Sequence, residues 1–469
     1  MRRNFENSEP IKEFGTEKIS FNKEVLINGI YFRNGPNSYL DLPNEHIFDG
    51  DGMVHHAYFE YNKGTVSYGN DYIQTNKFVN ERKYNTPFFN RIGYLNLIAI
   101  MSWFINRLYY HVDPFLINGE GNANTSIIYH AGRLLALNEA DYPYELSYDT
   151  STNRLKTIGR YTFGNKLTHN VNAHPKIDPV TNELILLGYD LFKAPYCKIS
   201  IVNSNGILTQ TFDVELPHPI VIHDFSITQK YIIIMDLPLT WSISRLLSFK
   251  PIIYYDTTST CRLGLINRDT LNIKWFVLRE KTVIFHFVNS WEEDNKLYIY
   301  AICYDYRSFD IYNLDKQQAL LKLFTVDLLE DPDTFIVDSS IVSHTPCEFP
   351  SLHSDNIGRH TEHFYYLKIG LHGFDGIIKY NTITKKEVIL KLKDGYTCGE
   401  VSVMDNDRLI TYVYNSVDKL SAIHVYDGET MNEIPILVIP LTHRIPIGFH
   451  GQFIKYNLDN RLDNHLDVM

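Results

Sequence analysis

One kind of β-hairpin recurs seven times along the chain, and this repeat restricts the possible folds more than any other feature. Each copy is an apolar strand that ends in Tyr-Asp, Tyr-Asn or a similar pair, then a polar turn, then a second strand. The copies span residues 56–69, 144–160, 198–214, 263–278, 322–337, 376–390 and 423–439. Long helical periodicity is scarce between them. The sequence therefore predicts an all-β protein.

A second unit precedes several of these hairpins, namely a polar turn that leads into an apolar run. Examples are HAGRLLALNE, ITQKYIIIMDLP, EDNKLYIYAICY and DNDRLITYVYN. An inner strand followed by an outer hairpin builds a propeller blade, and radial repetition leaves few sheet edges exposed. The spacing of the copies is irregular, which indicates insertions on one face. We predict a single seven-bladed β-propeller domain over residues 1–469 with loop or helical lid insertions, rather than a β-sandwich array or two barrels.

The charge balance and the cysteines restrict the function and the compartment. The 469 residues include 44 Lys and Arg against 55 Asp and Glu, and no basic run is present, so a nucleic-acid partner is not expected. No apolar stretch follows the arginines at the start of the chain, so we expect no signal peptide. The cysteines, odd in number and without a CxxC pair, are expected to be free thiols in a reducing cytoplasm. They are Cys197, Cys261, Cys303, Cys347 and Cys398.

Four of the 19 histidines lie among apolar or small residues at the mouths of predicted inner strands: His174, His223, His286 and His450. They fall in different predicted blades, so a propeller would bring them together on its axis. Four neutral imidazoles suit iron, copper or zinc, although a zinc site is expected to close at four tetrahedral ligands. The residue types alone leave the choice among these metals open. Most other histidines are expected to be ordinary surface or core residues.

Three glutamates are candidates for supporting such a site. A metal-bound histidine usually donates its second N–H to a carboxylate, which fixes the ring orientation. Glu139 follows a predicted strand, Glu348 lies in CEFPSL, and Glu400 lies in GYTCGEVSVM. Each one alone could equally be a solvated surface charge, but Glu139 and Glu348 are flanked by apolar strand residues.

Several ordered segments resemble the motifs of the carotenoid cleavage oxygenases, from about residue 20 to the C-terminus. They include YFRNGPN, HIFDGDGMVH, GNANTSIIYHAGRLLALNEADYPYEL, AHPKIDP, HDFSITQKYIIIMD, FHFVNSWEE, EFPSL, GEVSVMDNDRLITYVYN and GFHGQF. The resemblance implies a seven-bladed propeller with one Fe(II) on its axis, held by the four histidines named above. It also implies that Glu139, Glu348 and Glu400 accept hydrogen bonds from His223, His286 and His450 respectively, and that Thr125 lies near an open iron position. The sequence departs from the family pattern at Ser351 and in the residues that follow Glu400.

The resemblance implies a dioxygenase that uses O₂ to split a double bond of a carotenoid or apocarotenoid into two carbonyl products. The substrate supplies all four electrons, so no reductant and no side-chain general base are expected. A stilbene-cleaving branch of the family usually has a lysine just before the strand-end glutamate. Here that residue is Asn138, whose amide provides no positive charge for a phenolate. An isomerohydrolase branch uses the same iron set without cleavage, and a non-catalytic interaction propeller would leave the four histidines without a purpose.

One apolar segment, residues 94–110 within an insertion of about 92–112, resembles an interfacial helix that dips into a bilayer. Trp103, Tyr109 and Tyr110 would lie at its edge with Arg107 among them. A second apolar stretch, residues 237–255, could sit beside it. We expect peripheral contact with the inner face of a membrane, so that Trp103→Asp or Phe104→Asp would release the protein from liposomes. The alternative is that both stretches are lid helices packed on the propeller.

Overall fold

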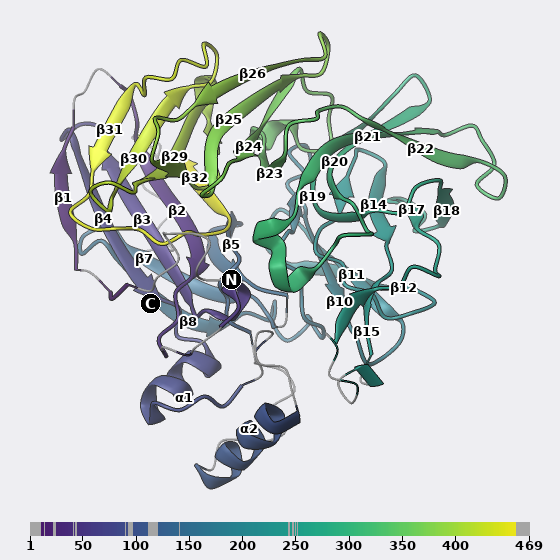
Figure 1. The fold of residues 1–469 in the computed structure, drawn as a ribbon, viewed down its shortest axis with the longest axis horizontal. Helices are drawn as coiled ribbons and strands as arrows, with labels where there is room; N and C mark the ends of the chain where they lie inside the picture. Colours follow the sequence, from purple (N-terminus) through teal and green to yellow (C-terminus); the bar gives the residue numbers. More distant parts are fainter. Residues whose placement is uncertain are drawn as a thin grey trace. The chain divides into compact units, whose positions relative to one another are not determined.

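β-Strands make up most of the regular structure (Figure 1). The computed structural model describes residues 11–455 except 14, 22–24, 41, 43–44, 90, 92–96, 111–120, 140, 243, 246–247, 249 and 251. Within those residues there are two α-helices, α1 (Asn76–Tyr84) and α2 (Leu97–Tyr109). The chain divides into two compact units, residues 1–171 with 391–469, and residues 172–390. The prediction of an all-β protein is confirmed.

All seven predicted hairpins form, each as two neighbouring strands of one sheet. The pairs are β3 (Gly52–Glu60) with β4 (Thr65–Tyr72), β7 (Tyr144–Asp149) with β8 (Arg154–Arg160), β11 (Tyr196–Val202) with β12 (Leu208–Glu215), β17 (Arg262–Asn267) with β18 (Ile273–Leu278), β21 (Ala319–Asp327) with β22 (Ile336–Ile341), β25 (Phe374–Asn381) with β26 (Lys386–Lys391), and β30 (Leu420–Asp427) with β31 (Leu437–Pro440). Burial alternates along strands such as β7 and β31, which therefore present one face to a core, whereas β3 and β4 are buried along almost their whole length.

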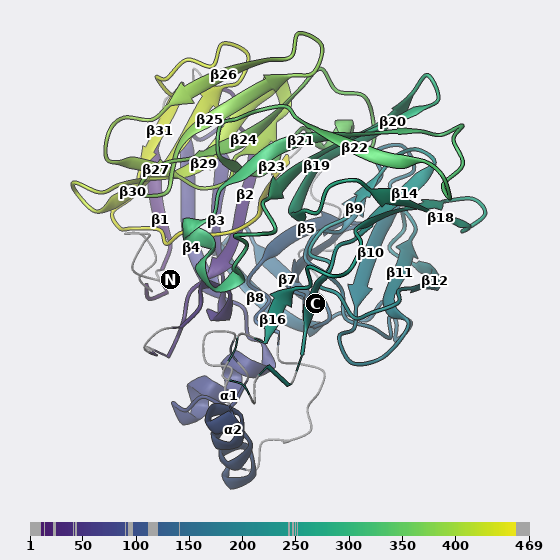
Figure 2. The same cartoon turned by 45° about the vertical axis from the view of Figure 1, so that its right-hand side comes forward.

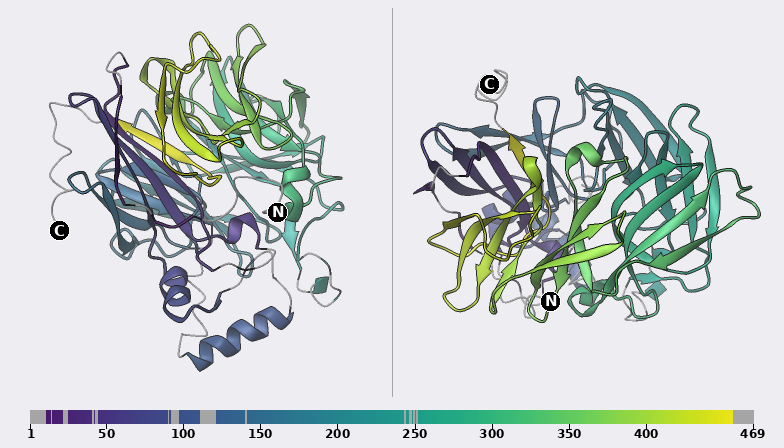
Figure 3. Two further views of the ribbon diagram at one scale, coloured as in Figure 1. Left: turned by 60° about the vertical axis from the view of Figure 1, so that its left-hand side comes forward. Right: turned by 90° about the horizontal axis from the view of Figure 1, so that it is seen from above.

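The described residues of the first unit form three sheets, and β32 (Gly451–Lys455), the last described strand, completes one of them. Their orders are β1 (Glu17–Ser20), β4, β3, β2 (Gly29–Pro36), β32; then β5 (Ser126–His130), β6 (Arg133–Leu137), β7, β8; and β27 (Tyr396–Cys398), β29 (Arg408–Asn415), β30, β31, with β28 (Ser402–Met404) paired to β29. The first and third of these sheets lie side by side (Figure 3) and share a core that includes Tyr31, Tyr68, Tyr412 and Ile423. Antiparallel pairing of β2 with β32 places Arg33 opposite Gly451, directly after His450.

The second unit contains a larger sheet than the sequence predicts. Eight strands run in the order β13 (Ser226–Ile227), β14 (Tyr231–Asp236), β17, β18, β22, β21, β20 (Lys296–Tyr304), β19 (Val283–Glu293). The other sheets are β12, β11, β10 (Leu184–Tyr189), β9 (Lys176–Ile177); β23 (Cys347–Ser351), β24 (His363–Ile369), β25, β26; and β15 (Leu239–Trp241) with β16 (Ile253–Tyr255). The last pair occupies part of the predicted apolar stretch 237–255.

The prediction of seven separate blades is wrong, because two of the predicted hairpins belong to one sheet. Among the described residues there are five sheets of four or five strands, one of eight and one of two. The eight-stranded sheet arises because β18 and β22 pair in parallel, with Val277 opposite Ile336 and Leu278 opposite Val337. This pairing satisfies backbone groups that would otherwise lie at two open edges. The radial arrangement of the sheets stays a prediction.

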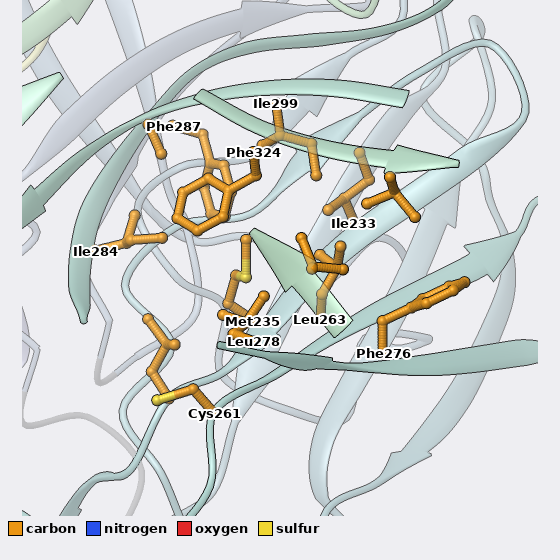
Figure 4. Close-up of a cluster of buried hydrophobic side chains, with 14 of the residues drawn as sticks. Ile233, Met235, Cys261, Leu263, Phe276, Leu278, Ile284, Phe287, Ile299 and Phe324 are labelled. Carbon is orange, nitrogen blue, oxygen red and sulfur yellow. The ribbon is translucent and has the colours of Figure 1, made fainter. Parts of the chain in front are cut away.

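A hydrophobic core supports the eight-stranded sheet (Figure 4). Ile284 and Phe287, which lie close to His286 on β19, pack with Met235 and Leu263 from β14 and β17. Burying side chains of this size stabilises a fold by about 1.5–3 kcal/mol each. This core packing therefore holds strand β19 in place independently of the side chains of the candidate site.

The helices α1 and α2 lie beside each other (Figure 2), and Phe78 of α1 packs against Met53 of β3 and Tyr72 of β4. Thr75 caps α1, since its hydroxyl oxygen accepts a hydrogen bond from the backbone N–H of Phe78 at 3.1 Å. Glu81 on the same helix is buried and accepts hydrogen bonds from Arg91 and from the backbone N–H of Phe88. This network ties Phe88 and Arg91, which follow α1 along the chain, to that helix.

One part of the prediction for α2, the position of Trp103, is wrong. Trp103 is buried, with 6% of its surface exposed, and Arg107 donates a hydrogen bond to the carbonyl of Phe88 at 2.7 Å instead of facing solvent. An apolar row nevertheless remains exposed, comprising Met101, Phe104, Ile105, Leu108 and Tyr109. Residues 92–96 and 111–112 of the predicted insertion lie outside the described residues. No helix in the described part of the chain is both long and apolar enough to span a membrane.

Candidate metal centre

Three imidazoles converge within the second unit. The Nε2 atom of His223 lies 3.1 Å from Nε2 of His174 and 3.4 Å from Nε2 of His286. The possible ligand atoms of these three residues all lie within 4.8 Å of one another. One Nε2 atom offers either a single N–H or a single lone pair, so His223 cannot hydrogen bond to both neighbours at once. A cation shared by the three lone pairs satisfies all of them.

These separations fit coordination of one metal ion. Metal–nitrogen bonds of about 2.1 Å place neighbouring ligand atoms about 3.0 Å apart in an octahedron and about 3.4 Å apart in a tetrahedron. The two measured Nε2 separations lie within that range. A set of neutral imidazoles suits a borderline divalent ion such as iron, copper or zinc. The residues present therefore fit a metal, although the geometry alone does not choose among these ions.

Irregularities in the strands aim His286 and Glu348 at each other. The register between β19 and β20 shifts once before His286 and once after it, so bulges flank this residue. The register of β23 with β24 also shifts after Glu348, where Phe349 adopts a positive φ of 52°. Bulges turn side chains away from the regular alternation of a strand and are common beside active sites. As a result, Glu348 Oε2 lies 2.5 Å from His286 Nδ1.

Glu348 is held by two further donors. The Tyr304 hydroxyl donates to its Oε1 at 2.9 Å, and the backbone N–H of Phe349 donates to its Oε2 at 2.7 Å. Burial acts to raise the pKa of the Glu348 carboxyl, but the attraction of His286 and these hydrogen bonds outweigh it, so the pKa is lowered. Burial and the neighbouring Glu348 raise the pKa of Tyr304 well above its usual value. Glu348 therefore stays an acceptor, and Tyr304 stays a donor.

His174 and His223 lie in loops joined by one buried side chain, Asn172. Its Nδ2 donates to the carbonyl of His223 at 3.1 Å, while its Oδ1 accepts from the backbone N–H of His174 at 3.3 Å. Ile222 and Phe225, on either side of His223, pack into the core that β10, β11 and β14 share. The apolar residues that flank His223 in the sequence thus hold its loop against the sheet.

His450 belongs to the first unit, where its Nδ1 lies 2.8 Å from Glu400 Oε1. The second oxygen of Glu400 accepts from the backbone N–H of Gly451 at 3.1 Å. The carbonyl of Thr125 accepts from the backbone N–H of His450 at 3.0 Å, so Thr125 and His450 are neighbours. This pairing of an imidazole Nδ1 with a carboxylate is the same as that of His286 with Glu348, and it leaves Nε2 as the remaining ligand atom.

Glu139 also belongs to the first unit, where it is half-buried just after β6. Its carbonyl accepts a hydrogen bond from Asn170 at 2.9 Å. Of the histidines expected to be ordinary, His46 caps a short 3₁₀-helix, His55 contacts the Tyr68 hydroxyl, and His56 contacts Asp71.

Aromatic rings surround the imidazoles of the second unit. The ring of Phe285 lies 4.8 Å from that of His223, and Phe349 lies 5.5 Å from His286. Phe309 packs against Phe285 and Tyr304, with ring centroids 5.8 and 5.6 Å apart. Neighbouring rings of this kind provide apolar surface that suits an apolar ligand.

Sequence reasoning missed Asn172, Tyr304 and Asp224. Asn172 and Asp224 had a local signal, since they lie two residues before His174 and directly after His223. Tyr304 had none, because it lies on β20 and reaches Glu348 on β23 only where two different sheets meet in the folded unit.

Comparison with known proteins identifies the family. The family model described as retinal pigment epithelial membrane protein, RPE65, matches residues 25–455. Because the match covers most of the chain, the protein belongs to this family, which is the carotenoid cleavage oxygenase family that the motifs resemble.

Curated relatives align along almost the whole chain. Carotenoid 9,10(9',10')-cleavage dioxygenase 1 of Arabidopsis thaliana is 30% identical over 91% of this chain and 84% of its own length. The enzyme of the same name from Pisum sativum is 29% identical, also over 91% of this chain and 84% of its own length.

Solved structures share the fold. A lignostilbene dioxygenase from Pseudomonas brassicacearum superposes with a TM-score of 0.82 at 22% identity, covering 97% of this chain and 98% of that one. A cobalt-substituted Synechocystis ACO superposes with a TM-score of 0.80 at 22% identity, with the same coverage. At this level of identity the likeness concerns the fold alone.

Proposed function

We propose that this protein is a non-haem Fe(II) dioxygenase that cleaves a carbon–carbon double bond of a carotenoid or apocarotenoid with O₂. The products are two carbonyl compounds. The observation that carries the proposal is the convergence of His174, His223 and His286, with His286 oriented by a buried carboxylate. A ferrous ion held by this set would supply the activation of O₂.

We assign His450 as the fourth ligand. Its Nδ1 is paired with Glu400, so its Nε2 is the nitrogen left for the metal. Thr125, next to His450 through a backbone hydrogen bond, would line an open position of the ion. Glu139 is the proposed acceptor for His223. The two units would then form the single oxygenase domain that the sequence predicts, which the family match across both units supports.

The residues around the site would bind the substrate and exclude water. Phe285, Phe309 and Phe349 present apolar ring surfaces beside the imidazoles, where a polyene can pack. Asn138 donates its amide to Asn124 at 3.2 Å and carries no charge with which to stabilise a phenolate. This residue favours a carotenoid or apocarotenoid over a phenolic stilbene, in agreement with the names of the curated relatives.

Product analysis tests the proposal. Protein loaded with Fe(II) is incubated in air with β-carotene, with apocarotenals and with resveratrol, and carbonyl products are identified by mass spectrometry. We expect aldehydes from a carotenoid or an apocarotenoid, none under anaerobic conditions and none from His286→Ala. If resveratrol alone yields aldehydes, the proposed substrate class changes from a carotenoid to a stilbene. If none of the three compounds yields a carbonyl product, the proposal is contradicted.

We also propose that the protein contacts a membrane from the cytoplasmic side through α2. The support is the exposed row of Met101, Phe104, Ile105, Leu108 and Tyr109 on that helix. A large apolar surface of this kind favours the boundary between lipid headgroups and acyl chains. A carotenoid resides in membranes, so this contact would bring the protein to its substrate.

A further inference from the structure

One buried carboxylate, Asp224, contacts all three segments that carry the ligands of the second unit. Its Oδ2 accepts from the backbone N–H of Phe287 at 2.8 Å, and its Oδ1 accepts from the backbone N–H of Phe225 at 2.7 Å. Its Oδ1 also pairs with Lys176 Nζ at 2.7 Å, and only 2% of its side chain is exposed. Each of these donors is thus within two residues of a proposed ligand along the chain.

The three contact points lie next to the imidazoles along the chain. Phe287 directly follows His286, Asp224 itself directly follows His223, and Lys176 is two residues after His174. Consecutive Cα atoms are about 3.8 Å apart and covalently linked. A contact residue that shifts therefore carries the neighbouring histidine with it by almost the same distance. Metal ligands must be held to about 0.5 Å for productive geometry.

The backbone alone does not hold the three segments together. His174 precedes β9 at one sheet edge, His223 precedes β13, and His286 lies on β19, at the opposite end of the eight-stranded sheet from β13. No ladder of backbone hydrogen bonds directly joins these three positions in the described sheets. The carboxylate of Asp224 contacts all three segments at once. By contrast, the Asn172 amide joins only the loops of His174 and His223, and the Ser290 hydroxyl on β19 reaches only β13.

We infer that Asp224 is a positioning residue, which sets the spacing of the three imidazoles by fastening their segments to one carboxylate. This inference rests on the proposed metal centre. Substitution by Asn would replace one acceptor oxygen with an NH₂ group that faces a backbone N–H or Lys176, so one segment would lose its anchor. Loss of a residue that orients ligands typically weakens metal binding by about 10- to 100-fold.

Cobalt(II) binding to the metal-free protein tests this inference without relying on turnover. We expect Asp224→Asn to weaken Co²⁺ binding at least tenfold and to shift the visible absorption band of the bound ion, which reports ligand geometry. Asp236→Asn is the matched control, because Asp236 is also buried in this unit but pairs with Arg262 at 2.6 Å. It should lower the melting temperature and leave the cobalt affinity and spectrum unchanged.

A second variant guards against misfolding of Asp224→Asn. Lys176→Met keeps the carboxylate but releases the segment of His174, so we expect a threefold to tenfold loss of cobalt affinity. Wild-type affinity and spectrum in both variants would overturn the positioning role of Asp224. A wild-type protein that binds no Co²⁺ would instead overturn the proposed metal centre itself, so the two failures are distinguishable.

Discussion

At the scale of single residues, the centre depends on hydrogen bonds that orient imidazoles. Glu348 pairs with His286, Tyr304 and Phe349, whereas Glu400 pairs with His450 and Gly451. The additional donor for Glu348 is a side-chain hydroxyl, which can be removed without disturbing the backbone.

Tyr304→Phe should therefore weaken metal binding without removing a ligand. The change leaves Glu348 Oε1 without its donor, and an unpaired buried polar atom costs about 1–3 kcal/mol. We expect cobalt affinity to fall about threefold to tenfold and the melting temperature to fall. The aromatic packing against Phe285 and Phe309 remains.

Tyr366→Phe is the matched comparison for this variant. Tyr366 is buried in the same unit, and its hydroxyl donates to Glu387 instead of Glu348. It should lower the melting temperature while leaving cobalt affinity unchanged. Equal effects of both variants on cobalt affinity would refute a specific role for Tyr304.

The lowered pKa of His424 predicts that the folded protein loses stability in acid. Burial, assisted by Lys393, lowers its pKa to about 4, so the unfolded chain binds a proton at a pH where the folded protein does not. The stability contributed by this depressed pKa is present above about pH 6.5 and is lost as the pH falls toward 4. Between pH 7 and pH 5 the loss amounts to roughly 2 kcal/mol.

Melting curves at both pH values measure this effect. Between pH 7 and pH 5, the melting temperature of the wild type should fall further than that of His424→Gln. The exposed His372→Gln serves as a control and should behave as the wild type does. Identical pH dependence in all three proteins would show that His424 does not contribute.

At the scale of elements, the hairpin repeat predicts far more than the irregular segments do. Each of the seven hairpins forms because its turn residues and its alternation of apolar and polar residues are local signals. The parallel pairing of β18 with β22 joins strands that lie about 60 residues apart in the sequence. Nothing in the sequence of either strand indicates which strand it pairs with. The same reasoning explains why Trp103 was expected on the surface, since its burial depends on residues distant in the sequence.

Membrane binding by α2 is testable on the residues that are exposed. Phe104→Asp and Ile105→Asp should each reduce sedimentation with phosphatidylcholine liposomes, because each places a charge in the exposed apolar row. Ile158→Asp on β8, where the side chain is 54% exposed, is the matched control and should bind as the wild type does. Undiminished binding of both α2 variants would remove this helix from the contact.

At the scale of the whole molecule, the sequence identifies the histidines and the glutamates that pair with His286 and His450, but not the other groups that arrange them. His174, His223 and His286 stand out because each imidazole lies among apolar residues, and the structure brings them together. Asp224, Asn172 and Tyr304 act through contacts between segments, which no short motif encodes.

The five cysteines offer a test of the fold as a whole. All are buried free thiols, and burial raises the pKa of Cys303 to about 12. At pH 8 only about one Cys303 thiol in ten thousand is then a thiolate, the form that reacts. We expect Ellman's reagent to label native protein slowly and to label five thiols rapidly in guanidinium chloride. Rapid labelling of the native protein would contradict the described packing.

Iron stoichiometry tests the central claim most directly. Protein purified without oxygen and loaded with Fe(II) should retain one iron per chain after gel filtration, as measured by mass spectrometry of the element. His223→Ala should retain much less than the wild type, because His223 is the imidazole that lies next to both others. An equal iron content in the wild type and His223→Ala would contradict the account.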